Sequence, residues 1–504
     1  MGKRKLGIAI SYANTILNMV CGLFLSSYLL RMLGQTDYGI YQTVCSFANY
    51  LVLLEFGTGT VITRNIARCR ACKHEDEIQK NVSTVWKVSL LLAILLALVS
   101  LVFYAGIPTI YRNTLSSEQI VYAKKIFGVE AAYLIISFFS SIPHGIMLGF
   151  EKYEIQPLIA FVKLLVRTIA LTMLVFCFRM AIVIVFVDAA LSVVVLVFDL
   201  WFCTTKLGVK FTTKRFDKGI FIDALPLSLA IMIQCIVNQA NSNVDKFVLG
   251  IKLSPESVAV YSVGLYIYSI FSSLSTIPIS MFAPQVVKEI ERGAEGRQLE
   301  NYLIKPSRLI VLVGGTIVFG FVAVGKQFLA IVYGEEYLIA WVVALIIMFP
   351  MLLNMSNGIL INVLDAKNLR MSRSLVLLIT TLANILLTLL WVDRWGMIGA
   401  SVATAICTVI GQITLMNIYY SKKLHIDVLY MYQKTFTGIL VWQVMAAFAG
   451  NYATRWITNS FVAFVAGGLI YVALFAIFFL IDKANSEEKA EIVRVFKRLT
   501  RMEK

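Results

Sequence analysis

Charged residues are scarce in this sequence, and histidines are scarcer still. Asp, Glu, Lys and Arg together make up 15% of the 504 residues, whereas hydrophobic residues reach 59% and the mean hydropathy is +0.80. A water-soluble domain usually carries about 25% charged residues, so the composition excludes a chain built from such domains. With three histidines and no evident Ser-His-Asp set, we expect no catalytic residues and no enzyme activity.

The eight cysteines give no sign of a disulfide framework or a metal site. In the topology derived below, none of them falls in an outer loop, where oxidising conditions would favour pairing. Cys69 and Cys72 have the spacing of half a zinc site, but no second ligand pair is nearby. We therefore expect no metal and no cofactor.

Long apolar runs fill most of the chain. They recur in stretches of about 20 residues or more, the length that a helix needs to cross about 30 Å of hydrocarbon. Backbone amides in lipid must bond within their own segment, so these runs are expected to be helices. The sequence predicts an all-α polytopic membrane protein with about 14 transmembrane helices, over roughly 6–30, 38–62, 83–107, 121–149, 154–178, 181–203, 218–242, 257–283, 309–333, 337–362, 371–393, 396–420, 435–454 and 457–481.

The positions of Lys and Arg orient these spans. If the N-terminus is inside, 32 of the 45 Lys and Arg residues lie in inner segments and seven lie in outer loops. This bias follows the positive-inside rule and supports an even number of spans. Both termini are therefore expected on the cytoplasmic side of the membrane. The basic charge belongs to short loops, so no nucleic-acid partner is expected.

Landmarks repeat along the chain at an offset of about 216 residues. Gly34 corresponds to Gly250, and Arg179 corresponds to Arg394. The offset predicts two parallel six-helix lobes, residues 1–210 and 211–425. Two additional transmembrane helices follow in 426–481, and a basic cytoplasmic tail occupies 482–504.

Ionisable residues inside the spans are the main candidates for function. Lys163 and Arg167 are four residues apart and share one helix face, with Glu130 and Asp188 at similar depth on the neighbouring spans and Glu55 in span 2. A charge facing lipid costs at least about 2.5–3.5 kcal/mol, so such groups normally face a partner or a wet cavity. Two interpretations stay open. The charges either only clamp helices together, or they line a cavity that receives an anionic or polyhydroxyl head group.

The chain resembles a known family over nearly its whole length. The resemblance is carried by the runs Leu30–Tyr41 (LRMLGQTDYGIY), Asp245–Gly250 (DKFVLG), Tyr333–Tyr337 (YGEEY) and Trp395–Ala400 (WGMIGA). These runs, in this order, are similar to those of the polysaccharide-transport flippases, the exporters of O-antigen and capsule repeat units. That family belongs to the multidrug/oligosaccharidyl-lipid/polysaccharide superfamily.

The resemblance implies a function and a set of binding residues. It implies two six-helix lobes around a central cavity, in a bacterial cell (inner/plasma) membrane. It also implies alternating access that moves a polyprenyl-diphosphate-linked oligosaccharide from the inner to the outer leaflet, for cell-surface polysaccharide synthesis. Arg31 and Arg64 match the family's motifs and join Lys163 and Arg167 as candidates for binding substrate, with a gating or structural role open for Arg31. Glu55, Glu130 and Asp188 are candidates for lining the cavity or coupling an ion, a proton or sodium at Glu130 or Asp188.

Expected partners are the lipid-linked oligosaccharide, membrane lipids, and a polysaccharide polymerase with its chain-length proteins. Two alternative functions are export of small organic cations or drugs and flipping of the peptidoglycan lipid precursor. A membrane polymerase or ligase is disfavoured because the outer loops, about 3 to 15 residues long, leave no room for a catalytic domain.

Overall fold

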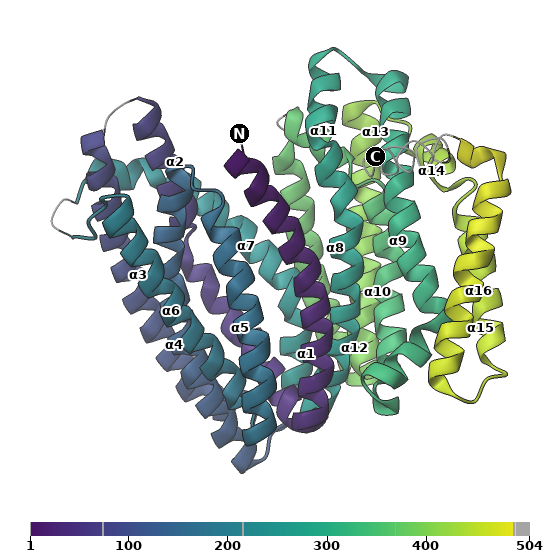
Figure 1. Cartoon of the computed structure of the whole chain (residues 1–504), viewed down its shortest axis with the longest axis horizontal. Coiled ribbons are helices and arrows are strands. Elements are labelled where there is room, and N and C mark those ends of the chain that lie inside the picture. The colour runs from purple at the N-terminus through teal and green to yellow at the C-terminus, as the bar shows by residue number, and fades with distance from the viewer. Residues whose placement is uncertain (1, 73–74, 214–215, 368, 487–488, 490–504) are drawn as a thin grey trace, which may run out of the picture. The chain divides into compact units, whose positions relative to one another are not determined.

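The computed structural model describes residues 2–72, 75–213, 216–367, 369–486 and 489, and it is helical throughout (Figure 1). No strand occurs within these ranges. The predicted basic tail lies largely outside them. The α-helices are α1 (Gly2–Ala48), α2 (Thr58–Ala71), α3 (Glu75–Ile110), α4 (Ser117–Gly149), α5 (Ile155–Phe178), α6 (Ile182–Lys206), α7 (Lys218–Lys252), α8 (Pro255–Glu291), α9 (Gly296–Val332), α10 (Ile339–Ser356), α11 (Leu360–Ala366), α12 (Arg370–Cys407), α13 (Met416–Leu424), α14 (Val428–Phe436), α15 (Leu440–Thr454) and α16 (Ser460–Ile481).

Short segments of tighter or wider helix interrupt this series. Three are 3₁₀-helices, η1 (Asn49–Glu55), η2 (Glu335–Tyr337) and η4 (Lys483–Asn485), and one is a π-helix, η3 (Thr408–Leu415). The span predicted over 38–62 is built from the second half of α1, then η1, then the start of α2. The break between η1 and α2 falls at Phe56 and Gly57, which both have positive φ, 52° and 64°.

Ten helical stretches in the described part of the chain are long and apolar enough to cross a membrane. Two of them, Ala13–Ala71 and Ser372–Leu424, each contain two of the predicted spans. The chain reverses inside them at Gly34 (φ 78°, ψ 171°) and Gly396 (φ 57°, ψ −138°). These backbone angles are essentially open only to glycine. With α7 and α15 the stretches account for all fourteen predicted spans, so the prediction of an all-α polytopic membrane protein is confirmed.

The chain divides into two compact units, Met1–Ala259 and Val260–Lys504. In the first unit α4 packs against α2, α3 and α6, and α1 packs against α4, α5 and α7. In the second unit α9 contacts α10, α14, α15 and α16, and the pair α15–α16 is the yellow hairpin of Figure 1. The first unit thus includes α7, which the sequence assigns to the second six-helix lobe. The division into lobes at 210 and 425 stays a prediction.

A buried arginine holds the end of the described chain in the second unit. Arg308 of α9 is 7% exposed and donates hydrogen bonds to Lys434 O (2.7 Å), Thr437 O (2.9 Å) and Asn485 Oδ1 (2.7 Å). Asn485, itself fully buried, donates in turn to Gly438 O at 2.8 Å. A buried cation is tolerated when its donors are met in this way, so Arg308 joins α9, the α14–α15 connection and η4.

Candidate polar site in the first unit

Two pairs of polar side chains connect α5 and α6. Arg167 donates from Nε to Asp188 Oδ1 at 2.5 Å and from Nη2 to Asp188 Oδ2 at 2.8 Å. One turn nearer the start of α5, Lys163 Nζ donates to Ser192 Oγ at 3.1 Å. Residues four apart lie on one helix face. Positions 163 and 167 of α5 can therefore face positions 192 and 188 of the antiparallel helix α6. The structure therefore brings together three of the predicted residues, Lys163, Arg167 and Asp188.

The ion pair faces the interior of the first unit. The Arg167 and Asp188 side chains are 29% and 16% exposed, so neither projects freely from the helix surface. Arg167 interacts electrostatically with Tyr41 of α1 and Tyr133 of α4. Glu130 of α4, 6% exposed, interacts with both members of the pair. Two helices besides α6, namely α1 and α4, thus contribute polar groups around Arg167.

Lys246 of α7 adds a cation that the sequence reading counted in an outer loop. Its Nζ donates to Gln42 Oε1 of α1 at 3.4 Å, and the Gln42 amide donates to the Tyr38 hydroxyl at 2.8 Å. Lys246 also interacts electrostatically with Cys45, which in turn interacts with Glu130. The available signal was the run Val244–Gly250, which continues the apolar pattern of α7 past the predicted span end at 242.

Asp199 is a second residue that sequence reasoning missed. It lies on α6 seven residues after Ser192, on the same helix face, and it is 1% exposed. It interacts electrostatically with Lys163. The spacing of Asp188, Ser192 and Asp199 along one apolar span is the signal that would have found it.

Together these side chains form what we call the polar cluster. Its cations lie on α5 and α7, its carboxylates on α4 and α6, and its hydroxyls mostly on α1 and α4. The members are Tyr38, Tyr41, Gln42, Cys45, Glu130, Tyr133, Lys163, Arg167, Asp188, Ser192, Asp199 and Lys246. With three cations and three carboxylates, a side chain of the cluster can give up a partner within the cluster and bind a charged molecule or ion instead.

The other predicted site residues lie on other segments of the first unit. Arg31 is exposed on α1, just before the Gly34 turn, and Arg64 is exposed on α2. Glu55 ends η1 and shares a hydrogen bond with Ser141 of α4. Across the described residues, no group of three His, Cys, Asp or Glu side chains is arranged to hold a metal ion.

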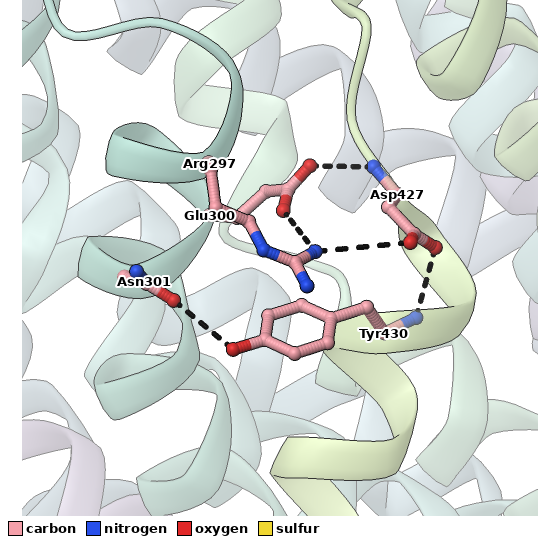
Figure 2. A network of polar contacts seen from close by, with 5 residues as sticks. All are labelled: Arg297, Glu300, Asn301, Asp427 and Tyr430. Carbon is pink, nitrogen blue, oxygen red and sulfur yellow. Dashed lines mark hydrogen bonds and ion pairs between the residues drawn. The ribbon is translucent and has the colours of Figure 1, made fainter.

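A charged cluster in the second unit has a different character (Figure 2). Glu300 of α9, 3% exposed, accepts from Arg297 Nη1 at 3.0 Å and from the Asp427 backbone N–H at 2.6 Å. The Arg297 guanidinium lies 3.3 Å from the centre of the Tyr430 ring, whose hydroxyl donates to Asn301 Oδ1 at 3.3 Å. Its charges are paired with one another and join α9 to α14, so we assign it a structural role.

Across the described residues, many apolar helical spans with a polar cluster among them define a multi-pass membrane protein. Residues 6–284 match the family model described as polysaccharide biosynthesis protein. Because that match covers more than half of the 504 residues, the chain belongs to this family. The family resemblance inferred from the sequence motifs is thereby confirmed.

Two similar proteins are both named as flippases, and the solved structure of one of them has the same fold. The chain is 23% identical over 237 residues to Agl15 of Haloferax volcanii, a probable low-salt glycan biosynthesis flippase. That match covers 46% of this chain and about half (49%) of the relative. The structure of the lipid II flippase MurJ, inward closed, superimposes with a TM-score of 0.73 at 18% identity, over 94% of this chain and 99% of MurJ.

The same fold occurs in a drug transporter. An inward-facing multidrug resistance MATE family transporter of the MOP superfamily aligns with a TM-score of 0.62 at 15% identity, over 84% of this chain and 99% of that one. At these identities the two solved structures establish the fold alone. All three similar proteins are named as flippases or transporters rather than enzymes.

Proposed function

We propose that this protein is a flippase that moves a polyprenyl-diphosphate-linked oligosaccharide from the inner to the outer leaflet by alternating access. The observation that carries the proposal is the polar cluster around Arg167 within the spans of a polysaccharide biosynthesis protein. Moving one sugar hydroxyl into hydrocarbon without a partner costs roughly 4–8 kcal/mol. An oligosaccharide has many hydroxyls, so its transfer requires a polar route through the spans.

Within this proposal the two cations of α5 have different tasks. Lys163 donates to a neutral hydroxyl, so its ammonium can leave that partner and bind a diphosphate more readily than the paired Arg167 can. Arg167 is held by Asp188 in a two-bond geometry and presents its remaining donors in a fixed direction. Arg31 and Arg64 are proposed as further contacts for the anionic head group nearer the two membrane surfaces.

Glu130 and Asp188 are the proposed carriers of a coupling ion. Both interact electrostatically with Arg167, so a proton or sodium ion taken up by either carboxylate would weaken its hold on the guanidinium. Coupling of this kind would link ion movement to release of the head group. Glu55, which shares a hydrogen bond with Ser141, is proposed to line the same route closer to the inner surface.

The proposed location is the plasma membrane of a bacterium, with both termini in the cytoplasm. The bias of Lys and Arg toward inner segments supports this orientation. The substrate and a polysaccharide polymerase with its chain-length proteins are proposed partners. Export of small organic cations and flipping of the peptidoglycan lipid precursor are the alternatives, and the experiment below separates them.

Replacing Lys163 with alanine is expected to reduce surface polysaccharide about 10-fold to 100-fold in cells that lack the chromosomal gene. This range corresponds to the loss of one or two hydrogen bonds to a charged group. The measurement is surface polysaccharide per cell, with the amount of the protein in the membrane held equal. The matched control is Lys124→Ala, a half-buried lysine on α4 that lies 4.8 Å from the centre of the Tyr104 ring, away from the polar cluster.

Undiminished surface polysaccharide in the Lys163→Ala strain would contradict the binding role. Normal polysaccharide in the deletion strain, together with drug sensitivity or a growth arrest that the intact gene reverses, would overturn the proposed substrate. Drug sensitivity would identify the cation exporter. Growth arrest with loss of cell-wall synthesis would identify the precursor flippase.

A further inference from the structure

An apolar cavity of about 490 Å³ lies in the first unit, apart from the polar cluster. Its walls come from the η1–α2 junction, from α3, and from α7 with the residues just before it, and they include Val61, Val88, Leu91, Phe216, Phe221 and Leu225. The charged residue among those lining it is Lys87. The volume falls within the range of about 300–1,000 Å³ that is typical of small-molecule sites.

Lys87 marks the level of the cavity relative to the membrane. No charged residue follows it on α3, and the next one along the chain is Arg112, beyond the end of that helix. Lys87 therefore stands where the apolar stretch of α3 begins. Trp86, its neighbour, belongs to a residue type enriched at the membrane–water interface. The Lys87 side chain is exposed, and its ammonium lies 4.9 Å from the centre of the Phe216 ring. The cavity therefore extends from the headgroup level into the apolar layer.

The surrounding backbone keeps this cavity next to α7. The Thr84 hydroxyl of α3 accepts a hydrogen bond from the backbone N–H of Asp217 at 2.9 Å, and the Asp217 carboxylate caps the first turn of α7. Gly57, between the lining residues Phe56 and Thr58, lies so close to Ile231 of α7 that an added Cβ would come within 2.6 Å of its side chain. These two contacts fix the positions of α3 and α7 and so keep the cavity between them.

We propose that this cavity binds one acyl chain of an anionic glycerophospholipid, with the lipid phosphate against Lys87. Aliphatic and aromatic walls match an acyl chain and repel a sugar or a hydrated ion. A lysine at headgroup level attracts anionic lipids over zwitterionic ones. The bound chain would fill the space between α3 and α7 and brace the first half of α7. The site is separate from the proposed flippase substrate and does not depend on it.

Photocrosslinking tests the proposal on the full-length protein. A benzophenone amino acid replaces Leu225 in the cavity wall, and the protein is reconstituted in nanodiscs of an equimolar mixture of phosphatidylglycerol and phosphatidylcholine. Crosslinked lipid is identified by mass spectrometry. The expected result is about fivefold more crosslinking to phosphatidylglycerol, the preference that one lysine near the surface confers. Lys87→Gln is expected to remove that preference, and Lys124→Gln, the matched lysine on α4, to leave it unchanged.

Equal crosslinking to the two lipids in the otherwise unchanged protein would overturn the proposal. So would a preference for phosphatidylglycerol that survives Lys87→Gln. Adding polyprenyl phosphate to the mixed nanodiscs gives a further comparison. If it displaced the phospholipid from the crosslink at equal concentration, the site would belong to the carrier lipid and the proposed occupant would be wrong. Because Lys87 is exposed, a folding defect in Lys87→Gln is not expected, and its elution on gel filtration is compared with that of the unchanged protein.

Discussion

Replacing Arg167 with leucine is expected to destabilise the protein, and replacing Asp188 with leucine as well is expected to restore stability without restoring transport. The single change removes two hydrogen bonds, of 2.5 Å and 2.8 Å, from the Asp188 carboxylate. It leaves a carboxylate within a span, at a cost of about 2.5–3.5 kcal/mol or more. The double change removes both charges, and an apolar pair in the same place is often as stable as the ion pair it replaces.

Two measurements on the unchanged protein, the single variant, the double variant and a control variant distinguish a purely structural ion pair from a binding site. Thermal unfolding of the detergent-purified protein reports stability, and surface polysaccharide in a deletion strain reports transport. Arg292→Leu is the control, because Arg292 pairs with Glu289 at 2.8 Å but is 60% exposed. A surface pair of that kind contributes about 1 kcal/mol or less. Full transport by the double variant would mean that the ion pair only holds α5 to α6, and the proposed binding role would fall.

Replacing Gly145 with leucine is expected to abolish folding of the first unit. A Cβ at Gly145 would lie 2.3 Å from the backbone oxygen of Gly59 and 2.5 Å from Ile62 Cγ2. One turn on, a Cβ at Gly149 would lie 2.8 Å from Ile66 Cβ. Small residues four apart allow helices to approach closely in membranes, and here they bring α4 against the backbone of α2. Leucine cannot fit without separating the helices, at a cost of about 3 kcal/mol or more.

The amount of monodisperse protein extracted from membranes measures this effect. Gly468→Leu on α16 is the matched control, because an added Cβ there meets no atom within 4 Å. The control is expected to extract like the unchanged protein, and Gly145→Leu to give little or none. Equal yields from the two variants would show that α2 and α4 tolerate separation and would contradict the packing described for this unit.

The sequence was sufficient to predict the helical spans and their connections. Hydropathy predicted fourteen spans because lipid demands continuous apolar helices, and the turns at Gly34 and Gly396 fall at or next to the gaps between those spans. It could not predict that the second span would break at Phe56 and Gly57, since apolar residues continue across the break. Neither could it place α7 with the first unit, because that depends on which neighbours α7 contacts.

Part of the polar cluster was predictable from the sequence and part was not. Lys163 and Arg167 were found from their spacing and depth, because charges are conspicuous in apolar helices. Asp188 was also named from its depth, but the contact of Lys163 with Ser192 depends on the register of α5 against α6, which no local pattern fixes. Lys246 was missed because the predicted span ended at 242, whereas α7 continues through Val244–Gly250 to Lys252. The assignment of substrate-binding and ion-coupling roles within the cluster stays a prediction.

The most direct measurement follows a lipid-linked head group across a bilayer. The purified full-length protein is reconstituted in liposomes with a fluorescent polyprenyl-diphosphate oligosaccharide, and a membrane-impermeant quencher reports which leaflet holds the label. We predict that the unchanged protein and Lys124→Ala move the label between leaflets, and that Lys163→Ala slows the movement about 10-fold or more. Movement no faster than in protein-free liposomes would contradict the flippase assignment. Equal rates for Lys163→Ala and the unchanged protein would contradict the role given to the polar cluster.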